Sequence, residues 1–250
     1  MFMPLKQDFI SRISKRGLIA ETPVERLLLR EYGSMFVAEG VTHPPFVVFP
    51  DERSVTAFQV KAPTSTAIIG GLEFVLQARA ADALTDASEE ATRLGRTILP
   101  RGPDSGSRNY SDTVGLWASR VEPAIDHWIA QGSITPEAAK NIRSLSPFEQ
   151  VPVVLELEEQ GIYFAKDLSK SIIYSVAPPG TSQHLAMLAF DVTEFDEPEV
   201  RSILARNGWF QTVTSDLPHF TYLGVDETEL PSLGLKRVEN AGRFFWVPEI

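Results

Sequence analysis

The pattern of apolar and polar residues along the chain predicts several helices. The clearest start is Thr22-Pro23-Val24-Glu25, where threonine can cap the helix, proline suits its first turn and glutamate completes a capping box. Three leucines follow, and Gly33 is a suitable end. The alanine- and glutamate-rich stretch from Leu72 to Leu94 predicts a second helix, which Gly95 ends.

Short strands are expected between and after these helices, where β-branched and aromatic residues gather. Further helices are expected from Ser111 to Trp128, with a kink or break at Pro123, after Thr135, and from Asp196 to Asn207. The expected strands are Phe46–Phe49, Val55–Val60, Thr97–Pro100, Val153–Leu157, Ser171–Val176, Trp209–Thr214 and His219–Gly224, with a hairpin within Leu235–Val247. A few helices mixed with short, mostly antiparallel strands predict the α+β fold class.

Composition excludes several classes of protein and of site. The net charge of -10 over 250 residues disfavours non-specific binding to nucleic acids and steady binding to anionic membranes. Because there is no cysteine, a metal ion would need nitrogen and oxygen ligands. No apolar run approaches the ~20 residues that span a bilayer. Residues 1–16 carry basic side chains without the apolar segment of a signal peptide, which leaves the compartment open.

The chemistry-bearing residues cluster in the last third of the chain. The chain has four histidines: His43, His127, His184 and His219. We interpret His43 as a loop residue and His127 as a packed or surface residue. Two histidines and one carboxylate, His184, Asp191 and His219, match the ligand set of a catalytic zinc site whose fourth position is open to water. Asp216, three residues before His219, could then move that water's protons, although Asp216 could also simply form a turn.

The spacing of these residues sets conditions on the backbone. A straight strand would separate His184 from Asp191 by ~23 Å, and a helix would separate them by ~10 Å along its axis. If both residues bind one ion, the chain must turn near Ala186-Met187 before a strand that carries Asp191. Pro218 disfavours helix just before His219, so a tight loop that enters a strand is expected there.

The order of these motifs resembles a known family of peptidases. The sequence Ser182-x-His184-x6-Asp191, followed by Asp216-x-x-His219-Phe-x-Tyr222-x-Gly224, is similar to D-alanyl-D-alanine carboxypeptidases of the VanY type. Upstream, Ser105-Gly-Ser-Arg108-Asn-Tyr110 resembles the S-G-Y-R-S-Y element of the family, and 180–182 resembles its P-G-x-S-x-H approach. Asn207-Gly-Trp-Phe210 is similar to the segment before the last metal ligand. The resemblance covers roughly Leu72 to Gly224.

The resemblance implies a fold, an activity and roles for individual residues. Zn²⁺ would be held by His184, Asp191 and His219. Asp216 would be the general base and acid, and Arg108 would face substrate charge. Ser182 would support His184 or the substrate, and Trp209 would be a substrate wall unless it belongs to the core. The implied fold is a small antiparallel sheet flanked by helices, as in hedgehog and DD-peptidase domains.

The same resemblance implies a substrate and a division of the chain. The substrate would be a peptidoglycan stem peptide ending in D-Ala-D-Ala, hydrolysed by a metal-activated water in the periplasm or outside the cell. Residues 1–70 would form an N-terminal extension, 71–226 the catalytic domain, and 227–250 a C-terminal hairpin or tail.

Two departures from the family keep alternatives open. Met187 stands where the family has glycine, in the region where the spacing requires a turn. Asp216 stands where carboxypeptidases commonly have glutamate, whereas related L-alanyl-D-glutamate endolysins have aspartate. The alternatives are therefore an endopeptidase or VanX-like dipeptidase of the same fold and a catalytically silent domain that binds cell-wall peptide. Separately, two histidines and one carboxylate are also the ligand set of non-haem iron oxygenases.

Overall fold

The computed structural model describes residues 8–250. Residues 1–7, which belong to the N-terminal segment in which we expect no signal peptide, lie outside the described residues. The described chain divides into two compact units. The first comprises residues 8–47, 57–108 and 183–250, and the second comprises 48–56 and 109–182. The expected division near residues 70 and 226 stays a prediction.

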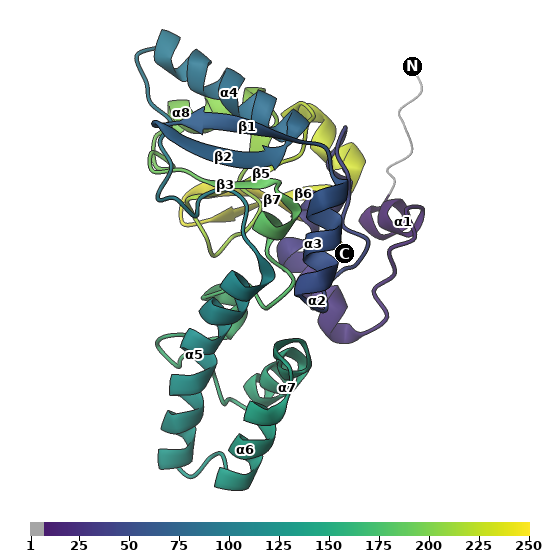
Figure 1. Cartoon of the computed structure of the whole chain (residues 1–250), viewed down its shortest axis with the longest axis vertical. Coiled ribbons are helices and arrows are strands. Elements are labelled where there is room, and N and C mark those ends of the chain that lie inside the picture. Colours follow the sequence, from purple (N-terminus) through teal and green to yellow (C-terminus); the bar gives the residue numbers. More distant parts are fainter. Residues whose placement is uncertain (1–7) are drawn as a thin grey trace. The chain divides into compact units, whose positions relative to one another are not determined.

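The first unit contains all of the strands that the structure describes, in three small sheets (Figure 1). β1 (Thr64–Ile69) and β2 (Leu72–Gln77) form an antiparallel hairpin. The second sheet has the order β3-β5-β4, from β3 (Ala189–Asp191), β5 (His219–Tyr222) and β4 (Trp209–Phe210), and both of its pairings are antiparallel. β6 (Leu235–Asn240) and β7 (Arg243–Pro248) form the last hairpin.

Helices cover these sheets. Those of the first unit are α1 (Phe9–Ser14), α2 (Pro23–Tyr32), α4 (Ala78–Arg93) and α8 (Pro198–Arg206), with short 3₁₀ turns at Gly33–Val37, Gln183–Ala186 (η3) and Glu227–Leu233. Figure 1 shows α4 along the β1–β2 hairpin. Beneath it, Phe74 of β2 packs edge-on against Phe190 of β3, with ring centroids 5.0 Å apart, and so joins two sheets in one core.

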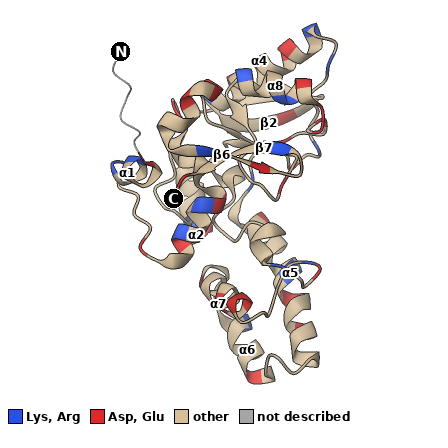
Figure 2. Cartoon of the chain, turned by 180° about the vertical axis from the view of Figure 1, so that it is seen from behind, with Lys and Arg blue, Asp and Glu red and all other residues tan. Residues whose placement is uncertain are grey.

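Arginines of α8 and of the loop after α4 form ion pairs within the first unit. Arg206 of α8 pairs with Glu90 of α4 at 2.5 Å, and Arg96 pairs with Glu199 of α8 at 2.6 Å. Figure 2 marks acidic and basic positions in red and blue on the ribbons of this unit. All four side chains are partly or well exposed, so each pair contributes only about 0–1 kcal/mol.

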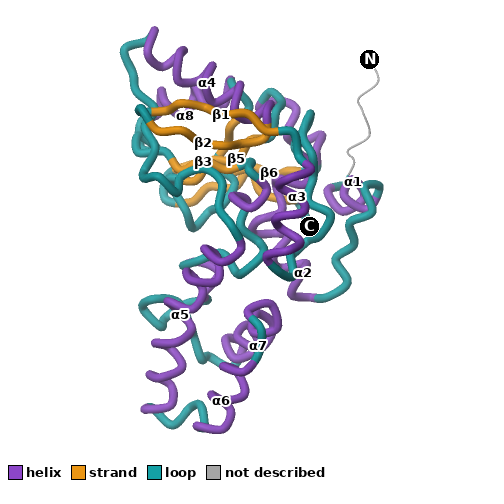
Figure 3. The backbone as a smooth tube through the Cα atoms, in the orientation of Figure 1, coloured by secondary structure: helices purple, strands orange, loops and turns teal. Residues whose placement is uncertain are grey.

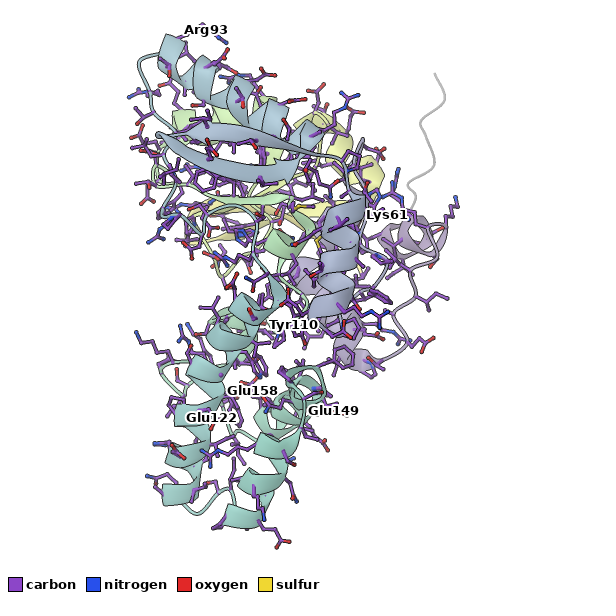
Figure 4. All side chains as sticks on the ribbon, in the orientation of Figure 1. Lys61, Arg93, Tyr110, Glu122, Glu149 and Glu158 are labelled. Atoms are coloured by element: carbon purple, nitrogen blue, oxygen red, sulfur yellow. The ribbon has the colours of Figure 1, made fainter. Side chains whose placement is uncertain are left out.

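The second unit is helical, as the tube drawing shows (Figure 3). Its helices are α5 (Tyr110–Ala130), α6 (Pro136–Ser144) and α7 (Pro147–Glu159), with a 3₁₀ turn at Ile172–Tyr174. Helix α3 (Glu52–Lys61) spans the two ranges. Glu158, labelled on α7 in Figure 4, is buried and accepts hydrogen bonds from the backbone N–H of Phe164 at 3.0 Å and of Ile172 at 2.7 Å. Burial raises the pKa of this carboxyl group, so Glu158 binds its proton more tightly in the folded chain.

The structure confirms the expected α+β class and the antiparallel pairing, while the hedgehog-like assignment stays a prediction. The capping box at Thr22 forms with Glu25, as predicted. The C-terminal hairpin forms too, and its turn places Ala241 at φ 50° and Gly242 at φ 71°, the left-handed pair that a tight hairpin turn requires. Among the residues that the structure describes, no helix is long and apolar enough to cross a bilayer.

Several predicted elements are wrong, two of them because a short apolar run fits a helix as well as a strand. The predicted strand Val153–Leu157 lies in α7, which Ser146 and Glu149 start with a capping box. The predicted strand Val55–Val60 lies in α3. Other corrections are bends at 45–48 in place of the strand Phe46–Phe49, a single bridge from Pro100 to Val192 in place of a strand at Thr97–Pro100, and a 3₁₀ turn at 172–174 in place of the strand Ser171–Val176. Helix α5 runs unbroken across Pro123, which overturns the predicted break there.

The predicted helix Leu72–Leu94 is wrong in its first six residues. Gly70 and Gly71, both at positive φ, close a turn that returns the chain antiparallel to β1. Residues 72–77 therefore form β2, and the helix begins only at Ala78. The preference of alanine and glutamate for helix is a weak local effect, and the pairing of two strands overrides it here.

Candidate metal site

Strand pairing brings two of the three proposed ligands together. Asp191 is the last residue of β3 and His219 is the first of β5, and the antiparallel register places them directly opposite each other. Residues opposite each other in such a pair have Cβ atoms ~4.5–5.5 Å apart, so their side chains meet on one face. The loop before β5 is fixed by the N–H of His219, which donates to the carbonyl of Asp216 at 3.2 Å.

A turn at Met187 brings His184 back to Asp191. His184 lies in η3, and the N–H of Met187 donates to the His184 carbonyl at 3.1 Å. Met187 has φ 57°, which is left-handed backbone, and β3 starts two residues later. The turn that the seven-residue spacing requires is therefore present, and methionine adopts the conformation that favours glycine.

Met187→Gly is expected to lower the melting temperature. Glycine would relieve about 1–2 kcal/mol of left-handed strain. The methionine side chain is only 3% exposed, however, and deletion of a buried side chain of this size costs about 2–5 kcal/mol. The lost packing outweighs the relieved strain, so we expect a net loss of about 1–3 kcal/mol in the free energy of unfolding, measured by thermal unfolding at equal metal loading. A higher melting temperature would show that strain dominates at this position.

The three side chains form a compact and largely buried group. Asp191 Oδ1 lies 3.1 Å from His219 Nδ1 and 3.4 Å from His184 Nε2. One ligand atom from each residue lies within 4.8 Å of the other two. The imidazole rings stand edge-to-face with centroids 4.9 Å apart. The side chains of His184 and His219 are 2% and 6% exposed and that of Asp191 13%, so water screens their mutual interaction only weakly.

The surroundings decide which ring nitrogen of His184 carries a proton. His184 Nδ1 lies 2.5 Å from the carbonyl oxygen of Gly106, which can only accept a hydrogen bond. Nδ1–H is therefore the donor. In the neutral ring, Nε2 then carries a lone pair, and that lone pair faces Asp191.

A second set of contacts decides the same question for His219. Its Nε2 lies 2.8 Å from Gln183 Oε1. The other end of that amide lies 2.8 Å from the backbone carbonyl of Tyr32, which accepts only, so this end must be the NH₂ group. The Gln183 oxygen therefore faces His219 and accepts from Nε2–H. The lone pair of the neutral ring is on Nδ1, again directed at Asp191.

Three acceptor atoms thus converge on one point. Burial lowers the pKa of His184, which favours its neutral form. Burial opposes ionisation of Asp191, but protonated His184 and His219 would outweigh this effect through their charge and hydrogen bonds and would hold the pKa of this carboxyl group far below its usual range. Two nitrogen lone pairs facing a carboxylate oxygen repel one another unless a cation lies among them. The group could therefore bind a metal ion, which is compatible with a metalloenzyme.

Arg108 forms an ion pair with the second oxygen of the Asp191 carboxylate. Its Nη2 lies 2.9 Å from Asp191 Oδ2, and its Nε donates to the carbonyl of Asp104 at 3.2 Å. The backbone N–H of Arg108 also donates to the His184 carbonyl at 3.3 Å. The guanidinium therefore leaves Oδ1 as the oxygen that faces the histidines. The substrate contact that the resemblance implies for Arg108 stays a prediction, and the structure adds a contact to a proposed ligand.

Arg108→Ala is expected to weaken zinc binding by about 10- to 100-fold, the usual effect of removing a group that orients a metal ligand. Arg108→Lys should recover only part of this loss, because lysine cannot reach both Asp191 and the Asp104 carbonyl with a planar fork. The measurement is the zinc Kd by chelator competition. An unchanged Kd together with a lower kcat/KM would instead assign Arg108 to the substrate alone.

The remaining predicted site residues have different surroundings. Asp216 is exposed in the loop before β5 and is not one of the three grouped residues. Trp209 of β4 is fully buried and packs on Tyr222, with ring centroids 5.4 Å apart, so in this structure it belongs to the core. Ser182 is buried as well. The burial of Trp209 therefore fits the core alternative that the sequence left open. The proposed roles of Asp216 in proton transfer and of Ser182 in substrate binding stay predictions.

Two contributors to the site carry no signal in the sequence. The carbonyl of Gly106 acts through the backbone, which any residue could supply. Gln183 fills an unspecified position between the serine and the histidine of the motif. Only the folded chain shows that Gln183 is 1% exposed and contacts His219.

Comparisons of the chain with family models, with curated proteins and with solved structures find no match. The geometry of the group formed by His184, Asp191 and His219 therefore carries the functional argument.

Proposed function

We propose that this protein is a zinc-dependent peptidase that removes the terminal D-alanine from peptidoglycan stem peptides. One observation carries the proposal: two imidazole lone pairs and one carboxylate oxygen converge at His184, Asp191 and His219. Three protein ligands are the number found in catalytic zinc sites, whereas structural sites are closed by four.

The donor set favours zinc over other ions. Mg²⁺ and Ca²⁺ prefer oxygen ligands alone, and this group offers two nitrogens. Two histidines and a carboxylate also suit non-haem iron, so metal analysis has to separate the two ions. When bound, zinc supplies Lewis acidity and lowers the pKa of a coordinated water to about 7.

The chain's own residues supply the rest of the proposed reaction. Asp216 would take a proton from the attacking water and return it to the leaving amine. Its exposure fits a group that must meet both water and substrate. Its backbone carbonyl accepts from the N–H of His219, so the loop holds Asp216 close to a ligand along the chain. The choice of D-Ala-D-Ala as substrate rests on the motif order of the chain.

The test is turnover of defined peptides by zinc-reconstituted protein. Release of D-alanine from a stem pentapeptide ending in D-Ala-D-Ala supports the proposal, with His219→Ala as the inactive control. Cleavage of only an L-alanyl-D-glutamate bond would assign the endopeptidase activity, which the aspartate at position 216 favours. Binding of the pentapeptide without any cleavage would overturn the enzymatic proposal in favour of a cell-wall-peptide-binding domain.

A further inference from the structure

We infer that Gln183 is a positioning residue that selects Nδ1 of His219 as the metal-binding atom and ties the N-terminal segment to the metal site. The effect of Gln183 on metal binding depends on the proposed metal site. Its central claim, the protonated nitrogen of His219, can be measured without any metal. The inference also gives a role to the N-terminal segment, which lies outside the region of family resemblance that starts near Leu72.

Gln183 lies at the centre of a closed set of hydrogen bonds. Its side chain has four polar neighbours: His219 Nε2 at 2.8 Å and the hydroxyl of Thr221 on the oxygen, and the Tyr32 carbonyl at 2.8 Å and Thr212 Oγ1 at 3.4 Å on the nitrogen. The two threonine hydroxyls lie 2.6 Å apart. All of these side chains are buried, so water cannot replace a partner that is lost.

Only one assignment of protons satisfies this set. The Tyr32 carbonyl requires the NH₂ end of Gln183, which leaves the amide oxygen as acceptor for both His219 and Thr221. Since the Thr221 hydroxyl donates to that oxygen, Thr212 must donate to Thr221. The second N–H of Gln183 then points at Thr212. Gln183 therefore donates to Thr212, Thr212 donates to Thr221, and Thr221 donates back to Gln183. This closed cycle of hydrogen bonds resists rotation of the Gln183 amide.

The fixed amide determines the tautomer of His219. An acceptor on the Nε2 side stabilises Nε2–H and leaves Nδ1 free to bind the metal. The amide oxygen takes the place of the carboxylate or carbonyl that usually accepts from a metal-bound imidazole. Without it, the Nδ1–H tautomer could donate to Asp191 at 3.1 Å, and Nδ1 would lose its lone pair as a ligand.

The Tyr32 carbonyl connects this set to the N-terminal segment. Tyr32 is the last residue of α2. The segment that follows is fixed on the same unit by the Ser34 hydroxyl, which donates to the Trp246 carbonyl at 3.1 Å, and by the N–H of Glu39, which donates to the Leu223 carbonyl at 2.9 Å. The end of α2 is thus anchored at both the C-terminal hairpin and the loop after β5. The N-terminal segment therefore contributes to the orientation of a metal ligand.

Gln183→Leu tests the inference, because leucine keeps much of the volume and removes both polar ends. Gln77→Leu is the matched control. Gln77 is 2% exposed, and its amide bonds to the backbone of Thr42 and, at 2.8 Å, to the Ala186 carbonyl beside the site, so these partners are backbone groups and not a histidine ring. Both changes should lower the melting temperature, since each leaves buried backbone groups unpaired.

The readouts separate positioning from general stability. In metal-free protein, ¹⁵N NMR of the imidazoles should show Nε2–H for His219 in the wild type and in Gln77→Leu, and loss of that signal in Gln183→Leu. The zinc Kd should rise by about 10- to 100-fold in Gln183→Leu and by far less in Gln77→Leu. Gln183→Glu keeps an acceptor for His219, so it should restore zinc affinity but not the melting temperature, because the Tyr32 carbonyl still lacks its donor.

Equal effects of Gln183→Leu and Gln77→Leu on the zinc Kd would overturn the inference, and so would an unchanged His219 tautomer in Gln183→Leu. Failure of the proposed function has a different signature. In that case the wild-type protein would bind no zinc or cleave no peptide, while the tautomer measurement would still decide the role of Gln183.

Discussion

Zinc should bind the wild-type protein at about one ion per chain, and His219→Ala should abolish this binding while most of the fold remains. The reason is the convergence of three acceptor atoms, of which the variant removes one and leaves two protein ligands. His184→Ala should have the same effect. Metal content after reconstitution and dialysis is the direct measurement, and circular dichroism reports whether the fold persists.

Thermal stability gives an independent readout of the same expectation. A ligand present at about 100 times its Kd stabilises the folded state by about 2.7 kcal/mol, so zinc should raise the wild-type melting temperature. His219→Ala should lose this increase. His127→Ala is the matched control, because this exposed histidine packs edge-on against Trp128 and should leave both zinc content and the zinc-dependent shift unchanged. Wild-type protein that stays metal-free after reconstitution would contradict the proposed site.

Local signals in the sequence predicted the elements that depend on local interactions. The capping box at Thr22 forms from side chains three residues apart, and the C-terminal hairpin depends on a two-residue turn at positive φ, a conformation that Gly242 adopts readily. The predicted strand Val153–Leu157 failed because β-branched residues fit a buried helix face as well as a sheet. There, the cap at Ser146 decided the outcome. The start of β2 depended on its pairing with β1, which no local pattern reveals.

The part of the site that depends on residue types and on their spacing along the chain could be predicted from the sequence. Each spacing of histidine and aspartate is common by itself, so the order of the motifs identified the group, and the rise of a strand or helix required a turn near Met187. The sequence does not show that Arg108 would lie on the carboxylate of Asp191, because that contact joins residues 83 positions apart. The Gly106 carbonyl and the Gln183 amide are common groups, and their role emerges only from what they contact.

Asp216→Asn is expected to lower kcat by at least about 10²- to 10⁴-fold while the protein keeps its zinc and its fold. General acid–base catalysis typically contributes a factor of this size, and asparagine cannot accept the proton of the attacking water. Zinc should remain because Asp216 is not among the three residues that converge on the site. Its exposed position before β5 also means that the substitution removes no buried contact. Single-turnover kinetics and metal content, measured on the same samples, test both halves of this expectation.

A second variant makes the assignment of Asp216 specific. Asp216→Glu should retain part of the activity, because carboxypeptidases of the resembled family commonly use glutamate at this position. Loss of zinc together with activity in Asp216→Asn would instead place Asp216 among the ligands. The site would then be closed by four side chains, as structural zinc sites are, and the catalytic proposal would fail with it.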